Sequence, residues 1–248
     1  MRVALVHDLL TRRGGAENVL KVLAEMFPSA PIYTLLYDER RLGSCFPRDR
    51  VRTSNVQRAT CLSTNHHLYF PWFPRAIESW NFSAFDLVIS SSTAFAHGAM
   101  TRTHPGVKHL CYIHSPARYL WDQTHDVLER AGRGALGTLK HWYLSHVFHR
   151  LRMWDVEMSD MPDLLLANSR AVQRRIELYW RHESRVVYPP VDLKQFLNLK
   201  PLDPARGRPG TCEPENLRTR RQYLILSTLT PTRGSISPSR HVTRCSAH

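Results

Sequence analysis

Two adjacent glycines, Gly14 and Gly15, separate a short apolar run from a helical pattern near the N-terminus. Residues 3–6 have the composition of a buried strand, and apolar residues recur at helical spacing from Ala16 onward. A strand that leads through a glycine turn into a helix can bind phosphate, because exposed N–H groups and the helix dipole favour an anion. The spacing is neither G-x-G-x-x-G nor a Walker P-loop, so a tight turn without a ligand stays open as an alternative.

Small polar side chains stand at the carboxyl ends of four predicted strands. They are His7-Asp8, Ser90-Ser91-Ser92, His114-Ser115 and Asn168-Ser169. Ligands of doubly wound parallel sheets bind beyond such strand ends, so we expect these groups and the glycine turn to line one open, basic-rimmed crevice. The alternative is that they only cap the following helices, and we favour it for Asn168 and Ser169.

Strand-like runs alternate with helical patterns along the first part of the chain, and this alternation indicates the fold class. The β-rich runs are residues 32–36, 51–56, 86–90, 109–114, 164–168 and 185–188, and helical spacing marks residues 136–158 and 170–180. The aromatic stretch 66–80, interrupted by Pro71 and Pro74, predicts a broken helix or a loop. The alternation predicts an α/β fold, a Rossmann-like doubly wound parallel sheet.

The composition is that of a folded, strongly basic protein. The chain has 248 residues, of which 42% are hydrophobic, and a formal net charge of +13. Such a charge favours an anionic partner: a nucleotide diphosphate, a phospholipid headgroup or nucleic acid. Because no run of five or more Lys and Arg residues occurs, we expect no nucleic-acid partner.

The cysteines and the apolar segments bear on the cellular compartment. Five cysteines lie far apart without a C-x-x-C pair, which favours buried free thiols in a reducing compartment over disulfides or a zinc site. The first apolar run is too short for a signal peptide, and no apolar stretch is long enough for a transmembrane helix. We therefore expect a cytoplasmic protein whose basic surface suits peripheral contact with the inner face of the cell membrane.

Five segments, in order, resemble the N-terminal half of family-4 retaining glycosyltransferases, which have the two-domain GT-B fold. They are residues 7–20, 85–98, 111–122, 164–176 and 186–196. The sequence YIHSPARYLWD within the third segment is most similar to bacterial mannosyltransferases that build cell-surface polysaccharides. In this family the active site is the cleft between two Rossmann-like domains, and the N-terminal domain holds mainly the acceptor.

The resemblance assigns roles to individual residues. Gly14 and Gly15 match the family's glycine-rich loop, which approaches the donor diphosphate. His114 matches the cleft histidine and is the expected catalytic residue near the reacting carbon of the sugar. Further substrate-binding candidates, from the same segments and from the strand ends, are His7, Ser91, Ser115, Arg118, Tyr119, Trp121 and Asp122.

The resemblance also implies the substrates. The donor would be a nucleotide sugar such as GDP-mannose or a UDP-sugar, the acceptor a glycan or a lipid-linked glycan, and no separate cofactor is expected. No D-x-D triplet occurs, so no metal-held donor is expected. The family's E-x7-E spacing occurs only at Glu17 and Glu25, in the first predicted helix rather than in a donor domain, and we interpret it as a coincidence on an exposed helix face.

The resemblance fades after residue 196, and this sets the expected domain organisation. Residues 1–196 form the acceptor-side domain, the Pro-, Gly- and Arg-rich residues 197–222 a linker, and 223–230 the remnant first strand of a donor domain. Residues 231–248 show no periodicity and are expected to be a disordered, out-of-frame tail. We expect the C-terminal domain to be missing and the chain to be an inactive fragment of a glycosyltransferase. The alternative is a non-catalytic module that binds an acceptor or a membrane.

Overall fold

Parallel strands build one sheet in the computed structural model, which describes residues 1–59, 70–133 and 136–191. The seven strands in these ranges are β1 Val3–Leu10, β2 Ile32–Tyr37, β3 Val51–Thr53, β4 Leu87–Ser92, β5 Lys108–Ile113, β6 Leu164–Ala167 and β7 Arg185–Val186. Their spatial order is β3-β2-β1-β4-β5-β6-β7, and every neighbouring pair is parallel. The predicted Rossmann-like α/β sheet is thereby confirmed. The predicted linker, remnant strand and tail lie outside the described residues.

The strand order reverses between β1 and β4. From β1 the chain adds β2 and β3 on one side, and it then returns to place β4 on the other side of β1. At such a switch point the neighbouring connections leave in opposite directions, which opens a crevice at the carboxyl ends of the two strands. In the register of β1 and β4, His7 lies opposite Ser91 at this end.

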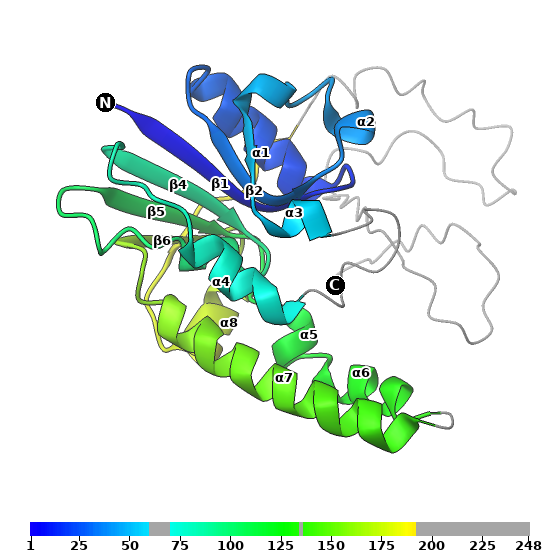
Figure 1. The fold of residues 1–248 in the computed structure, drawn as a ribbon. Helices are drawn as coiled ribbons and strands as arrows, with labels where there is room; N and C mark the ends of the chain where they lie inside the picture. The colour runs from blue at the N-terminus through cyan, green and yellow to red at the C-terminus, as the bar shows by residue number, and fades with distance from the viewer. Residues whose placement is uncertain (60–69, 134–135, 192–248) are drawn as a thin grey trace, which may run out of the picture. The chain divides into compact units, whose positions relative to one another are not determined.

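Helices cover both faces of the sheet (Figure 1). They are α1 Gly15–Met26, α2 Glu39–Leu42, α3 Val56–Ala59, α4 Phe73–Glu78, α5 Arg118–Trp121, α6 Thr124–Ala131, α7 Gly137–Met158 and α8 Arg170–Trp180, with 3-10 turns η1 Arg48–Arg50 and η3 Ala96–Gly98. Leu5 of β1 packs in one buried cluster with Leu20 of α1. On the opposite face, Ile113 of β5 packs with Ile176 of α8. Alternate residues of the central strands thus face different layers, as in any sheet that is buried on both sides.

The described boundaries correct three of the expected elements. β1 continues to Leu10, because it pairs with β2 beyond the point where its pairing with β4 ends. β3 ends at Thr53 rather than at residue 56, and α3 begins at Val56. Within the expected region 66–80, residues 66–69 lie outside the description, and Phe73–Glu78 form α4 with Pro74 in its first turn, where the missing N–H costs no helix hydrogen bond. None of the helices in the described ranges is both long and apolar enough to cross a bilayer.

Candidate functional site

Three of the predicted residues meet where the pairing of β1 with β4 ends, next to the end of β5. The Ser91 hydroxyl oxygen lies 3.2 Å from Nδ1 of His7 and 2.9 Å from Nε2 of His114, so it bridges the two imidazoles. His7 is buried, and His114 follows β5 directly, with its backbone N–H donating to the Ser92 carbonyl. The sheet register brings these side chains together from positions 7, 91 and 114.

Glu17, in the first turn of α1, extends this chain of contacts. Its Oε1 lies 3.7 Å from Nε2 of His7, and its side chain is only 12% exposed. Burial alone would raise the pKa of Glu17, but the His7 ring and the backbone N–H of Glu17 itself outweigh burial and lower the pKa. Glu25, in contrast, is exposed and pairs with Lys21. The expectation that both glutamates lie on an exposed helix face is therefore wrong for Glu17.

The glycine turn shapes the space around Glu17. Gly14 is the N-cap of α1 and has an extended backbone, with φ −152° and ψ −168°. A Cβ atom added to Gly14 would lie 2.9 Å from Glu17 Oε2, whereas one added to Gly15 would have no atom within 4 Å. Gly14 thus leaves room for the Glu17 carboxylate, and the helix N-terminus is open beside Gly15. An anion at this turn stays a prediction, and the nearby carboxylate restricts it to the Gly15 side.

His114 is held as a neutral imidazole. Burial, together with the neighbouring His7, lowers the pKa of His114 to about 4, although Asp8 and Glu17 act in the opposite direction. Its ring makes an edge contact with Tyr112, with ring centroids 5.2 Å apart, and its carbonyl accepts a 2.9 Å hydrogen bond from the Asn168 side chain. At pH 7 the ring can therefore donate one hydrogen bond and accept one, but it supplies no positive charge.

Asp8, the neighbour of His7, serves the fold rather than the crevice. Its buried carboxylate accepts hydrogen bonds from the Thr93 N–H and hydroxyl and from the N–H groups of Ala94, Phe95 and Ala96. These contacts fix the loop after β4 onto β1. Asp8 therefore has its acceptor sites filled by the protein, which corrects the expectation that it lines a ligand crevice.

The three serines at the end of β4 face different ways. Ser91 points to the imidazoles of the site, whereas Ser90 contacts His109 at 2.8 Å and Ser92 contacts His97 at 3.4 Å. This follows from the two-residue period of a strand. Only Ser91 of the three thus belongs to the site. The capping role that we favoured for Asn168 and Ser169 is confirmed for Ser169, whose Oγ accepts from the Val172 N–H at the start of α8. It is wrong for Asn168, whose side chain donates to the His114 carbonyl.

A second group of predicted residues gathers around α8. Arg175 donates to the Ser115 hydroxyl at 3.2 Å, and its guanidinium lies 3.3 Å from an Asp122 carboxylate oxygen. Asp122 also accepts a hydrogen bond from the Tyr179 hydroxyl. Arg175 was not among the predicted site residues. It belongs to one of the five family-like segments, and that was the only sequence signal for it.

The remaining candidates have packing partners or face solvent. The Tyr119 ring lies 4.9 Å from Phe70 in a hydrophobic cluster, and burial raises the pKa of its hydroxyl well above the usual value. Trp121 stacks on Tyr179, and its indole N–H donates to Asp155 at 2.8 Å. Arg118 is exposed at the start of α5. Ligand contact by these three residues stays a prediction.

A family model described as Glycosyltransferase Family 4 matches residues 13–195 of this chain. The chain belongs to glycosyltransferase family 4. Among solved structures it is similar to the crystal structure of Anabaena Alr3699/HepE in complex with UDP, at 13% sequence identity and a TM-score of 0.44. That match covers 79% of this chain and 46% of the other, so this family-4 chain spans about half the length of that structure. No curated protein matches it.

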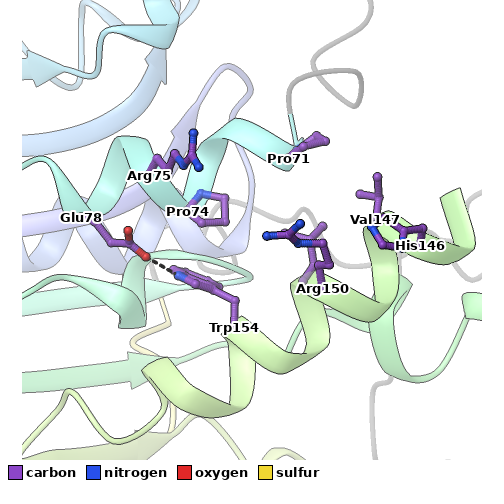
Figure 2. Close-up of a pocket in the computed structure, with 9 residues that line it drawn as sticks. Pro71, Pro74, Arg75, Glu78, His146, Val147, Arg150 and Trp154 are labelled. Atoms are coloured by element: carbon purple, nitrogen blue, oxygen red, sulfur yellow. Dashed lines mark hydrogen bonds between the residues drawn. The ribbon is translucent and has the colours of Figure 1, made fainter. Parts of the chain in front are cut away.

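This family-4 chain also has a groove away from the strand ends, between α4 and α7 (Figure 2). Its volume is about 430 Å³, and apolar side chains and the cationic Arg75 and Arg150 line it. Glu78 also lines it and accepts a 2.6 Å hydrogen bond from the Trp154 indole. Across the described ranges, no three His, Cys, Asp or Glu side chains are grouped closely enough to hold a metal ion.

Proposed function

We propose that this chain is the acceptor-side domain of a glycosyltransferase that moves a hexosyl unit, such as mannosyl, from a nucleotide sugar to a glycan or lipid-linked acceptor in the synthesis of a cell-surface polysaccharide. Family membership supports the reaction class. The observation that carries the proposal is the group formed by His7, Ser91 and His114 at the switch point between β1 and β4, which Glu17 connects to the first turn of α1, the helix that begins at Gly15.

The chemistry of glycosyl transfer suits this group. The bond between the anomeric carbon and the diphosphate oxygen breaks, an acceptor oxygen forms the new bond and loses its proton, and charge grows on the leaving diphosphate. Fixed N–H groups at a helix N-terminus stabilise such a charge, and the open side of Gly15 leaves space for it. The neutral imidazole of His114 is suited to hydrogen bonding with a hydroxyl of the transferred or accepting sugar.

A transfer assay tests this proposal. The chain would be assayed alone and together with the donor-binding domain of a family-4 enzyme, using GDP-mannose and UDP-glucose as donors. We expect transfer only with the donor-binding domain present, because the N-terminal domain supplies few of the nucleotide contacts. The His114→Ala variant should lower the rate by about 10²-fold or more, and Glu25→Ala is the matched surface control. Transfer that is insensitive to His114→Ala would contradict the assignment.

The alternative function, contact with an anionic membrane, is favoured by the outer surface of α7. Leu139, Trp142 and Met153 are each more than 60% exposed along one side of this helix. Lys140 is exposed in the first turn of the same helix. The first half of α7 projects beyond the sheet together with α6 (Figure 1). We propose that this apolar and cationic surface, named the α7 face, rests on anionic lipid, since aromatic and basic side chains combine at membrane interfaces.

Vesicle sedimentation tests the membrane proposal. Binding to phosphatidylglycerol vesicles should weaken several-fold in Trp142→Ala and fall further as salt rises, because the charges are screened. Met26→Ala, at an equally exposed apolar residue of α1, should bind like the unchanged chain. Equal binding by both variants would exclude the α7 face as the contact surface.

A further inference from the structure

We propose that Glu17 sets the direction of the hydrogen bonds along His7, Ser91 and His114, so that His114 presents an unprotonated Nδ1 and accepts a hydrogen bond from a ligand hydroxyl. Glu17 is then a positioning residue that acts through two other side chains. The identity of that hydroxyl, on the donor or acceptor sugar, rests on the proposed function. The directions of the hydrogen bonds follow from the contacts within the chain and do not depend on the proposed function.

The first step is the contact between Glu17 and His7. A carboxylate has only lone pairs, and Oε1 of Glu17 faces Nε2 of His7 at 3.7 Å. A bare Nε2 at this distance would place two lone pairs against each other in a buried space, whereas an N–H there points its dipole at the negative charge. In its neutral form His7 therefore carries its one proton on Nε2, and its Nδ1 is the acceptor.

The second step passes through Ser91, whose hydroxyl has a single proton. His7 Nδ1 lies 3.2 Å from Ser91 Oγ and needs a donor, so the hydroxyl proton points to His7. Only lone pairs of Oγ then remain for His114, whose Nε2 lies 2.9 Å away. His114 must donate this hydrogen bond, and its proton is on Nε2.

The third step concerns the far side of the His114 ring. The ionisable groups that act on it are His7, Asp8 and Glu17, and burial keeps the ring neutral at pH 7. With its single proton on Nε2, its Nδ1 is bare. Within the described part of the chain this Nδ1 has no hydrogen-bond partner, and other atoms do not fully enclose it. A bare, accessible nitrogen accepts from a hydroxyl and repels a phosphate oxygen or a carboxylate, which selects a sugar hydroxyl over an anion beside His114.

A substitution at Gly14 is a second way to disturb the contact between Glu17 and His7. A methyl group at Gly14 would lie 2.9 Å from Glu17 Oε2 and would displace the carboxylate from its place, whereas a methyl group at Gly15 meets open space. The backbone of Gly14 is extended, so alanine is compatible with it. Gly14→Ala should therefore reproduce the loss of Glu17, and Gly15→Ala should not.

Long-range proton–nitrogen NMR spectra of the uniformly ¹⁵N-labelled full chain at pH 7 test the proposal. The His7→Gln and His114→Gln variants assign the ring signals. In the unchanged chain we expect both rings protonated on Nε2 and bare on Nδ1. In Glu17→Ala and Gly14→Ala, both rings should gain the Nδ1–H form together. Glu25→Ala and Gly15→Ala should leave both rings unchanged, and circular dichroism confirms folding of each variant.

The proposal would be overturned by a protonated Nδ1 of His114 in the unchanged chain, by no change of either ring in Glu17→Ala, or by an equal change in Glu25→Ala. In Ser91→Ala the His7 ring should stay protonated on Nε2 while the His114 ring alone changes, and a joint change would also contradict the relay. No sugar or nucleotide enters this experiment, so failure of the proposed glycosyl transfer would leave these spectra unaffected and is detected separately by the transfer assay.

Discussion

Two buried aspartates should differ strongly in how much stability they lose on the same substitution by asparagine. Asp8 distributes its hydrogen bonds over both carboxylate oxygens: Oδ2 accepts from Thr93 and Ala94, and Oδ1 accepts from Phe95 and Ala96. An asparagine keeps only one oxygen. Whichever way its amide is turned, the NH₂ group faces at least two N–H donors that then have no acceptor.

Asp155 is arranged differently. Both of its hydrogen bonds, from the indoles of Trp121 and Trp180, go to Oδ2 at 2.8 and 2.7 Å. Its Oδ1 accepts none, and burial raises the pKa of this carboxyl in spite of the opposing effect of His97 and the two indoles. Asparagine can therefore keep both bonds and remove a charge that is costly to bury.

The expected magnitudes follow from these counts. The loss of at least two hydrogen bonds to a charged acceptor, at about 1.5–3 kcal/mol each, gives a destabilisation of roughly 3–6 kcal/mol for Asp8→Asn. This is a large fraction of the roughly 5–15 kcal/mol that stabilises a typical domain. For Asp155→Asn we expect a change within about 1 kcal/mol in either direction, because neither indole loses its acceptor.

Urea denaturation followed by circular dichroism measures both changes as shifts of the midpoint at constant m-value. Asp163→Asn is a matched control, since this half-exposed carboxylate accepts a backbone hydrogen bond from His109 and lies near Lys108. It should cost about 1 kcal/mol or less. An Asp8→Asn variant that is no less stable than Asp155→Asn would refute the argument from how the hydrogen bonds are distributed over the two carboxylate oxygens.

Three further predictions concern the core. Gly98→Ala should destabilise the fold by about 1–3 kcal/mol, because its new methyl group would lie 2.6 Å from the Trp154 ring. A melting temperature equal to that of Gly15→Ala would disprove this clash. Burial, aided by His97, lowers the pKa of His109 to about 3, so the folded state stays unprotonated where the unfolded chain takes up a proton. The contribution of His109 to stability should therefore be complete above about pH 6.5 and fall by about 1.4 kcal/mol per pH unit toward pH 3. The His109→Gln variant should reduce the slope of stability against pH by this amount, and an unchanged slope would count against it. Burial also raises the pKa of the Cys111 thiol, so native Cys111 should resist iodoacetamide until urea unfolds the chain, and rapid native labelling seen by mass spectrometry would contradict its enclosure.

The sheet could be predicted from the sequence because its strands are short apolar runs and because α1 and α8 carry regular apolar faces. The continuous apolar run Val3 to Val6 in β1 indicates burial on both faces, and these residues are buried. The run Leu164 to Ala167 in β6 is buried at alternate residues and half-buried at the others. The end of β1 could not be predicted in the same way. Residues 7–10 mix polar and apolar types, and pairing with β2 extends the strand through them.

The candidate site was predictable only in outline. Residue type alone does not distinguish Ser91 from Ser90 and Ser92, because the choice depends on which residue the register places on the side of His7. Nor does it separate Glu17 from Glu25. Glu17 packs against His7 in space that is free because Gly14 has no side chain. The role of Asp8 depends on a loop more than 80 residues away. These contacts are long-range, and local patterns carry no signal for them.

The central claim is that the end of β1, the glycine turn and His114 form one ligand site. An amide NMR titration of the labelled chain with UDP-glucose and GDP-mannose tests it most directly. We predict that the largest shifts occur at Gly15, Ala16 and His114, that they weaken in His114→Ala, and that Arg75 and Arg150 in the groove between α4 and α7 stay unchanged. Shifts confined to Arg75 and Arg150, or a complete absence of shifts at saturating ligand, would contradict the claim.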